Sequence, residues 1–333
     1  MTDEGALDPS VVIDALTELM LGESPHLTRA EVSEESGVQQ DVARSRWRAL
    51  GFPEADDDDV AFTQADVDAL QLTQELVGLG VLDAETEQAF IRTIGRTFAR
   101  LAEWQARAFL GSIAPADADE DDAVQQLELL QKIVPLGERV QAYVWRRHLV
   151  NAANRLLLTE SDDTDVAPMS VGFVDIVGYT SRSRNMTRTE LTDMVERFEE
   201  VTTGLITDHH GRVVKTIGDE VLFELDDPKE AALLALELLD QHVEDDDFPE
   251  VRIGMAHGDV LHHMGDVFGP VVNVAARLTS VARPASAVID QAMADELHDD
   301  DELRVKPMRR TSVKGYEHLK PWSLKRPKER SDD

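Results

Sequence analysis

The sequence feature that most constrains the fold is a change of hydrophobic pattern near Ser170. After this point, short apolar runs alternate with helical stripes. Runs of helices followed by alternating strands and helices indicate two domains and the α+β class. Before Ser170, apolar residues recur at helical spacing, as in the stripe Phe90, Ile91, Ile94, Phe98 and Leu101.

Length and composition set the expected domain boundaries. A chain of 333 residues exceeds what one hydrophobic core usually serves. We predict an all-helical domain over 1–160, a polar and acidic linker over 161–168, and a second domain over 169–333. Helices are expected at Val11–Leu21, Gln64–Leu79, Asp83–Phe109 and Asp122–Leu158, the last with a break or kink at Pro135 and Gly137.

The second domain has the order strand, helix, strand, strand, helix, strand. The apolar run Ser170–Ile176 suits a central strand, and Thr187 with Glu190 has the spacing of a helix capping box. This order predicts the ferredoxin-like, split βαβ arrangement. The later elements are expected at Val213–Ile217, Glu220–Leu225, Asp227–Leu239 and Val251–His257.

The charge and composition exclude several classes of function. The formal charge of −33 describes a surface that repels phosphate backbones and anionic lipids, so nucleic acid is a poor partner. Without cysteine there is no disulfide, thiolate nucleophile or cysteine zinc site. No apolar run is long enough for a membrane span, and the N-terminus lacks a secretion signal, so we expect a cytoplasmic protein.

Two carboxylates stand where predicted strands end, namely Asp175 and Asp219. If the two strands are neighbours, both acids project from one end of the sheet, where they can hold magnesium or manganese together with substrate phosphates. Each acid taken singly also has a structural interpretation, since Gly218 and Asp219 favour a tight turn. The pattern therefore predicts a metal site only if the two acids meet.

Other polar groups lie where a phosphate substrate would need them. Gly178, Tyr179 and Thr180 join a strand to a helix, so their free backbone N–H groups offer a phosphate site. Asn273 and Arg277 are four residues apart on one helix face, which also fits the polar margin of an amphipathic helix. No Walker loop and no dinucleotide-binding glycine motif is present, which excludes the usual nucleotide cradles.

Five segments in a fixed order carry a family resemblance. The region from Ser170 to Lys325 resembles the catalytic domain of the class III adenylyl and guanylyl cyclases. The resemblance implies a ferredoxin-like cyclase domain that uses two divalent cations, Mg²⁺ or Mn²⁺. The segments are Phe-Val-Asp-Ile-Val-Gly-Tyr-Thr, Lys-Thr-Ile-Gly-Asp, Ala-His-Gly-Asp, Gly-Asp-x-x-Gly-x-x-Val-Asn-x-Ala-Ala-Arg-Leu and Val-Lys-Gly.

The resemblance also implies a role for each matched residue and a substrate. Lys215 donates to adenine N1 and Asp266 accepts from the 6-amino group, which favours ATP, whereas guanylyl enzymes of the family tend to carry Glu and Cys there. Each active site is shared between two catalytic domains, so we expect a homodimer. The remaining roles are metal binding for Asp175, Ile176 and Asp219, ribose orientation for Asn273, phosphate stabilisation for Arg277 and binding of the terminal phosphates for Lys314.

The first half resembles the helical regulatory domain that precedes the catalytic domain in some actinobacterial adenylate cyclases, around Trp47–Pro53. We expect it to be autoinhibitory, with relief by pH or by a small apolar ligand, since the chain has ten histidines, including His148 near the linker, and abundant apolar stripes.

Rival interpretations come from other classes of protein. Leu27–Val38 through Trp47 resembles a helix-turn-helix of the MerR type, although its acids oppose DNA binding. Ile217–Val221 superficially resembles the turn of the diguanylate cyclases, but the Asn273–Arg277 helix argues against that family. The two remaining rivals are a guanylate cyclase and a nucleotide-binding domain without turnover.

Overall fold

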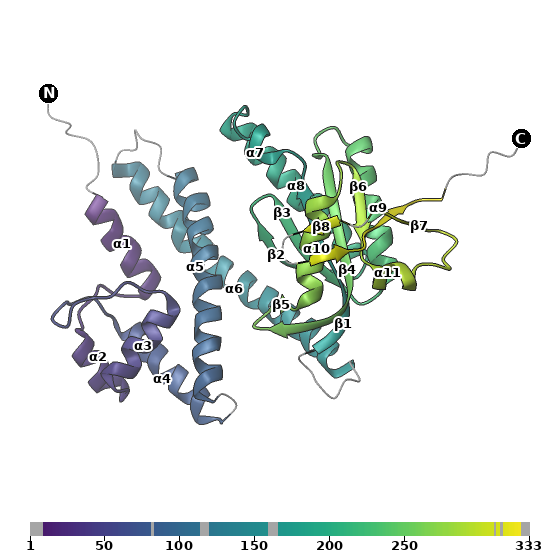
Figure 1. Cartoon of the computed structure of the whole chain (residues 1–333). Coiled ribbons are helices and arrows are strands. Elements are labelled where there is room, and N and C mark those ends of the chain that lie inside the picture. Colours follow the sequence, from purple (N-terminus) through teal and green to yellow (C-terminus); the bar gives the residue numbers. More distant parts are fainter. Residues whose placement is uncertain are drawn as a thin grey trace, which may run out of the picture. The chain divides into compact units, whose positions relative to one another are not determined.

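The computed structural model describes residues 9–80, 83–113, 120–158, 166–309, 311–313 and 316–327. It divides into two compact units, Met1–Leu157 and Leu158–Asp333, which we describe separately (Figure 1). Within the described residues, no helix is both long enough and apolar enough to cross a membrane.

The first unit is helical, as predicted. In its described part, β-structure is confined to one isolated bridge between Leu27 and Phe62. The expected break in the last helix is absent, because α6 continues through Pro135. The helices are α1 (Pro9–Leu21), α2 (Arg29–Ser36), α3 (Gln40–Leu50), α4 (Gln64–Gly78), α5 (Ala84–Ile113) and α6 (Glu120–Leu158).

Helices α3 and α5 cross at very short range. A Cβ atom on Gly95 of α5 would lie 2.4 Å from the backbone oxygen of Leu50 at the end of α3, so only glycine fits this crossing. Arg46 of α3, itself buried, donates from Nε to Glu87 of α5 at 2.8 Å. The two helices therefore form a rigid pair.

The second unit is built on a mixed sheet with the strand order β2-β3-β1-β4-β6-β10-β7, and β5 pairs with β4. The central strand β1 is antiparallel to both β3 and β4. This confirms the predicted α+β fold. The strands are β1 (Val166–Ile176), β2 (Arg212–Ile217), β3 (Glu220–Leu225), β4 (Val251–His263), β5 (Asp266–Phe268), β6 (Ser286–Ile289), β7 (Arg304–Pro307), β8 (Thr311–Val313), β9 (Tyr316–Leu319) and β10 (Trp322–Lys325).

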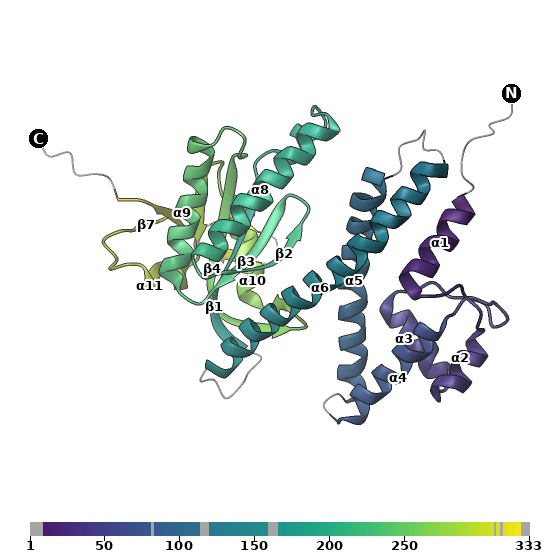
Figure 2. The ribbon, with the colours of Figure 1, turned by 180° about the vertical axis from the view of Figure 1, so that it is seen from behind.

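Helices cover both faces of this sheet. Alternate residues of β1 separate the two cores: Val174 and Ile176 pack under α8 and α9, whereas Val171 and Phe173 pack under α10. Figure 2 shows α8 and α9 on one face, and Figure 1 shows α10 on the other. The helices are α7 (Tyr179–Arg182), α8 (Arg188–Asp208), α9 (Pro228–Glu244), α10 (Pro270–Val281) and α11 (Gln291–Glu296).

Two strands extend well beyond their predicted bounds, and β2 begins one residue earlier than predicted. Strand β1 begins at Val166, inside the segment expected to be linker. The strand tolerates Pro168 because this residue pairs with β4 alone; pairing with β3 begins only at Ser170. At that position its missing N–H interrupts no second ladder. Strand β4 runs on to His263 and forms a hairpin with β5. The polar end of β4 does not have the apolar pattern by which a strand is predicted.

Candidate active site

A row of side chains crosses four strands at one end of the sheet. Ile217 of β2 pairs with Glu220 of β3, Glu220 pairs with Asp175 of β1, and Asp175 pairs with Arg252 of β4. Directly paired residues point to the same face of a sheet. Asp175 alternates with Val174 and Ile176, so the row lies on the face that α10 covers.

The structure brings the two predicted acids together. Asp219 lies in the turn between β2 and β3, and its backbone oxygen accepts a hydrogen bond from the N–H of Ile176 at 3.2 Å. Asp175 is nine-tenths buried, and burial raises the pKa of its carboxyl; the negative charge of Asp219 raises it further. The two carboxylates are thus close enough to repel each other.

Arg252 binds Asp175, although no sequence motif pointed to this arginine. Its Nε and Nη2 lie 2.6 and 2.5 Å from Oδ2 of Asp175. This ion pair lowers the pKa of Asp175, but less than burial raises it. The pair depends on the β1–β4 register over a separation of 77 residues, so no local pattern predicts it.

Glu220 is a second residue that sequence reasoning missed. Burial, together with the negative charges of Asp175 and Asp219, raises the pKa of Glu220 to about 7. Its position after the turn and opposite Asp175 is the signal that could have identified it. Three acids with this much repulsion create a site whose negative charge a cation would relieve.

The donor set fits divalent cations. Ile176 has a side chain in the core, with 1% of the residue exposed, so the ligand that it can offer is the backbone carbonyl. Carboxylate and carbonyl oxygens are the ligands that magnesium and manganese prefer. Within the described chain, no group of three or more acidic or histidine side chains is arranged to hold a metal. Phosphate or water oxygens would have to complete the coordination.

The predicted phosphate-binding turn follows directly. Gly178 adopts a left-handed conformation with φ of 70° and precedes the short helix α7. Tyr179 packs against the core under α8 and α9, and Thr180 is exposed. The amides of Ser181 and Arg182 are bonded to the carbonyl of Gly178, whereas no turn or cap hydrogen bond to a described residue is found for the amides of the three preceding residues.

Lys215 and Asp266 also meet, although 51 residues separate them. Lys215 Nζ lies 2.5 Å from Oδ2 of Asp266, while Oδ1 accepts from the backbone N–H of Val267 at 2.8 Å. Lys215 pairs with Leu222, whose side chain packs in the core under α10. The pair therefore stands on the same face of the sheet as Asp175.

The buried carboxylate of Glu224 on β3 supports the Lys215–Asp266 pair. Glu224 accepts hydrogen bonds from Arg212 Nε at 2.8 Å and from His262 Nε2 at 2.9 Å. Arg212 also donates to the backbone oxygen of Gly265 at 3.2 Å, directly before Asp266. This Arg212–Glu224–His262 cluster fixes the turn that presents Asp266.

Asn273 and Arg277 lie on α10, with the buried residues Ala275 and Leu278 on the neighbouring face of the helix. Asn273 is exposed and Arg277 is half-buried, and neither side chain is hydrogen-bonded to a described residue. The structure thus does not bring them to Asp175 and Asp219 by direct contact. Lys314 lies outside the described residues.

Comparison with known proteins gives the same assignment for both units. Residues 162–326 match the adenylate and guanylate cyclase catalytic domain, and residues 9–149 match the adenylate cyclase regulatory domain. The chain is 37% identical to an adenylate cyclase of Glutamicibacter nicotianae, covering 95% of this chain and 83% of that protein. It is also 37% identical to adenylate cyclases of Streptomyces coelicolor, covering 88% of this chain and 80% of that protein, and of Streptomyces griseus, covering 89% and 74%. The chain therefore belongs to the adenylate cyclases in which a helical regulatory domain precedes a class III cyclase catalytic domain.

Proposed function

We propose that this adenylate cyclase converts ATP to 3′,5′-cyclic AMP and pyrophosphate with two divalent cations, Mg²⁺ or Mn²⁺, at Asp175, Asp219 and the carbonyl of Ile176. The observation that carries the proposal is the meeting of two repelling carboxylates at one end of the sheet. When bound, the cations would lower the pKa of the ribose 3′-hydroxyl and neutralise the leaving pyrophosphate.

The protein's own groups would position the nucleotide for in-line attack on the α-phosphate. Asn273 would orient the ribose, and Arg277 would donate to the α-phosphate oxygens as their charge increases. Gly178, Tyr179 and Thr180 would bind phosphate oxygens through their backbone N–H groups. Lys314 would bind the terminal phosphates, a role that rests on the sequence alone.

The Lys215–Asp266 pair supports ATP rather than GTP as the substrate. An ammonium donates and a carboxylate accepts, which matches N1 and the 6-amino group of adenine. Guanine presents the opposite pattern at these two positions. The 2.5 Å contact between the two side chains satisfies both groups before the base enters, and adenine would replace this contact with one hydrogen bond to each.

We further propose a head-to-tail homodimer with two equivalent sites. Each chain holds the proposed metal-binding acids in one group and the proposed base-reading pair in another, and Asn273 and Arg277 form no hydrogen bond or ion pair with either group in the described part of the chain. A second copy could place its α10 against the acids of the first. The exposed side chains of Tyr143, Trp145 and Leu149 on α6 offer apolar area for such an association.

Mixing two inactive variants tests the shared site. Asp175→Ala removes a metal ligand and Asn273→Ala removes a ribose contact, so each homodimer should be inactive. In an equal mixture about half of the dimers contain both variants, and each has one intact site, so activity should return to about a quarter of the wild-type value. The control mixes Asn273→Ala with the double variant, which should stay inactive. A first mixture as inactive as its components would contradict the shared site.

Regulation of the catalytic unit by the helical unit, through pH or a small apolar ligand, stays a prediction, as does the cytoplasmic location. The same assay with GTP in place of ATP decides between adenylate and guanylate cyclase activity. Comparison of Mg²⁺ with Mn²⁺ identifies the preferred cation.

A further inference from the structure

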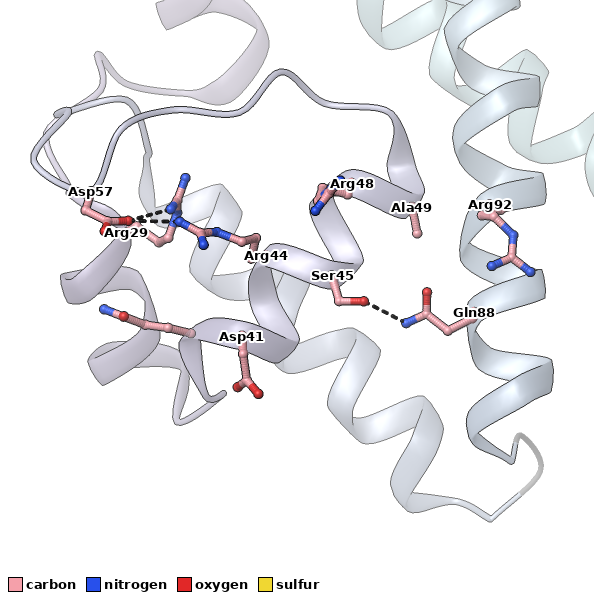
Figure 3. A pocket seen from close by; sticks show the side chains of 10 residues that line it. Arg29, Asp41, Arg44, Ser45, Arg48, Ala49, Asp57, Gln88 and Arg92 are labelled. Atoms are coloured by element: carbon pink, nitrogen blue, oxygen red, sulfur yellow. Dashed lines mark hydrogen bonds and ion pairs between the residues drawn. The ribbon is translucent and has the colours of Figure 1, made fainter.

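A polar pocket of about 740 Å³ lies in the helical unit, between α3, α5 and the loop that follows α3. Four guanidinium groups and two carboxylates line it, so its walls carry a net positive charge in a chain whose net charge is −33. Figure 3 shows Arg44, Ser45 and Arg48 on α3 and Arg92 on the facing helix α5. The charged lining residues are Arg29, Asp41, Arg44, Arg48, Asp57 and Arg92.

The guanidinium groups have fewer partners than they can use. Arg29 and Arg44 share Asp57, at 2.6 and 3.2 Å. Arg29 also donates from Nη2 to the backbone oxygen of Ala55, and Arg44 Nε lies 3.8 Å from Glu54. Arg29 is 3% exposed, and its Nε–H has no hydrogen-bond partner. Arg48 and Arg92 form no ion pair or hydrogen bond with a described residue. Of these four side chains, Arg29 is buried, so the desolvation cost of a missing partner applies to its Nε–H. Arg44, Arg48 and Arg92 are exposed, and their clustered like charges favour an external anion.

The scaffold around the pocket is rigid. Ser45 of α3 and Gln88 of α5 are hydrogen-bonded at 3.4 Å across its floor, and the glycine crossing at Gly95 fixes the two helices further along α5. The Cα atoms of Arg48 and Arg92 are therefore held in place before any ligand binds. Preorganised donors lose little entropy on binding.

Positive charge continues along α5 beyond the pocket. Arg92, Arg96 and Arg100 repeat every four residues, so their side chains lie on one face of the helix. None of the three has an ion-pair partner among the described residues. Like charges at this spacing weakly destabilise a helix, and an anion bound beside Arg92 would reduce this repulsion.

The chemistry of the lining identifies the class of anion. Guanidinium groups bind phosphate oxygens in pairs of parallel hydrogen bonds. Ala49 is the apolar residue of the lining, and no aromatic ring is present to stack on a base or hold an acyl chain. The acidic loop Asp56–Asp59 borders the site and would repel a long nucleic-acid backbone. The walls thus suit a compact ligand.

We propose that this pocket is an anion site for a compact oligophosphate, separate from the catalytic site. The ligand bridges α3 and α5 through Arg48 and Arg92, with Arg29 and Arg44 at its other end. This site does not depend on the proposed mechanism of cyclase activity. Its lining does not support the apolar ligand expected from the sequence.

Calorimetric titration of the full-length protein with inorganic pyrophosphate tests the proposal. Chelator is added so that no divalent cation holds pyrophosphate at the catalytic site. We expect saturable binding of one pyrophosphate per chain, weakened at least about tenfold by the double variant Arg48→Gln/Arg92→Gln. The matched control Arg146→Gln/Arg147→Gln removes two exposed charges from α6 and should bind as the wild type does.

Two further outcomes are decisive. The variant Arg48→Lys/Arg92→Lys retains the positive charges but not the paired N–H donors of the guanidinium group. Pyrophosphate binding between that of the wild type and that of Arg48→Gln/Arg92→Gln would support recognition by guanidinium groups. Equal binding by the wild type and the Arg48→Gln/Arg92→Gln variant, or no binding at about 1 mM, overturns the proposal.

A short DNA duplex is titrated in parallel. Binding of the duplex that is tighter than that of pyrophosphate and depends on the same arginines would identify a nucleic-acid surface instead.

Discussion

At the scale of single residues, Asp175 has to serve two partners. In the structure its Oδ2 accepts a hydrogen bond from Arg252 Nε and lies in an ion pair with Nη2, and the proposed function requires the same carboxylate to bind a cation. A cation and a guanidinium cannot both take all of the lone pairs of one oxygen. A cation at Asp175 would therefore compete with Arg252 for Oδ2 or be limited to Oδ1, and in either case the nearby guanidinium charge would oppose it.

This competition predicts that Arg252→Gln strengthens metal binding in the absence of nucleotide. The cation no longer displaces a charge-assisted ion pair, so its affinity should rise by up to about tenfold. Manganese titration followed by electron paramagnetic resonance, at about pH 8 to limit competition by protons, measures the effect. Arg184→Gln removes an exposed arginine and is the control. Weaker manganese binding in Arg252→Gln would refute the competition.

His209 predicts a pH-dependent stability. Burial would lower its pKa, but hydrogen bonds to Glu237 at 3.0 Å and Glu230 at 2.8 Å raise it above its ordinary value. A raised folded pKa contributes stability that is fully present below the unfolded value, near 6.5, and is lost as the pH rises through the folded value. Urea unfolding from about pH 5.5 to about pH 8.5 should show this loss in the wild type.

The matched variants are His209→Gln and His298→Gln. The first removes the bridge between α8 and α9, so its stability should fall most at low pH and its profile should be flatter. His298 is exposed, and its replacement should leave the wild-type profile. Identical pH profiles for His209→Gln and wild type would show that the His209 hydrogen bonds do not cause the loss of stability with rising pH.

At the scale of elements, the position of α10 decides where Asn273 and Arg277 point. A Cβ on Gly254 of β4 would lie 2.0 Å from the backbone nitrogen of Thr279, so glycine lets α10 rest directly on the sheet. The hydroxyl of Thr279 bonds to the carbonyl of Ala275 at 3.0 Å, which turns its polar atom inward to the helix. Helix α10 is thus held on the sheet by backbone contact as well as by its buried apolar residues.

We therefore expect Gly254→Ala to displace α10. The clash involves backbone and cannot be relieved by a rotamer change, so the free energy of unfolding should fall by about 3 kcal/mol or more, with loss of cyclase activity. Gly204→Ala is the control, because no atom lies within 4 Å of its added Cβ. In α8 this change should add about 0.5–1 kcal/mol. Denaturant unfolding measures the stability of both variants. Equal stabilities would contradict the close packing of α10 against Gly254.

The same elements show what a sequence can predict. The capping box of Thr187 and Glu190 is a local pattern, and α8 begins directly after Thr187, where this pattern places it. The Asp175–Arg252 pair and the arginine pocket depend on register and on helix crossings far apart in the chain, so no local pattern contains them. The Lys215–Asp266 contact was expected only through the family resemblance.

At the scale of the whole molecule, charge opposes folding. The chain has 66 acidic and 33 basic side chains, so like charges crowd the surface of each unit, as in the exposed run Asp56–Asp59 of the first. Self-repulsion of this kind destabilises the compact state. Salt screens it, because the Debye length falls to about 10 Å at 0.1 M.

The thermal unfolding midpoint should therefore rise with sodium chloride, by about 2–4 °C for each 1 kcal/mol of relieved repulsion in units of this size. Screening acts mainly below about 0.2 M, whereas exclusion of salt from the protein surface grows steadily toward molar concentrations. The shape of the curve separates the two effects, so a steep rise at low salt followed by a shallow slope is expected. A midpoint that does not change below about 0.2 M would mean that local ion pairs, such as Lys229 with Asp300 and Glu302, already balance the excess of acids.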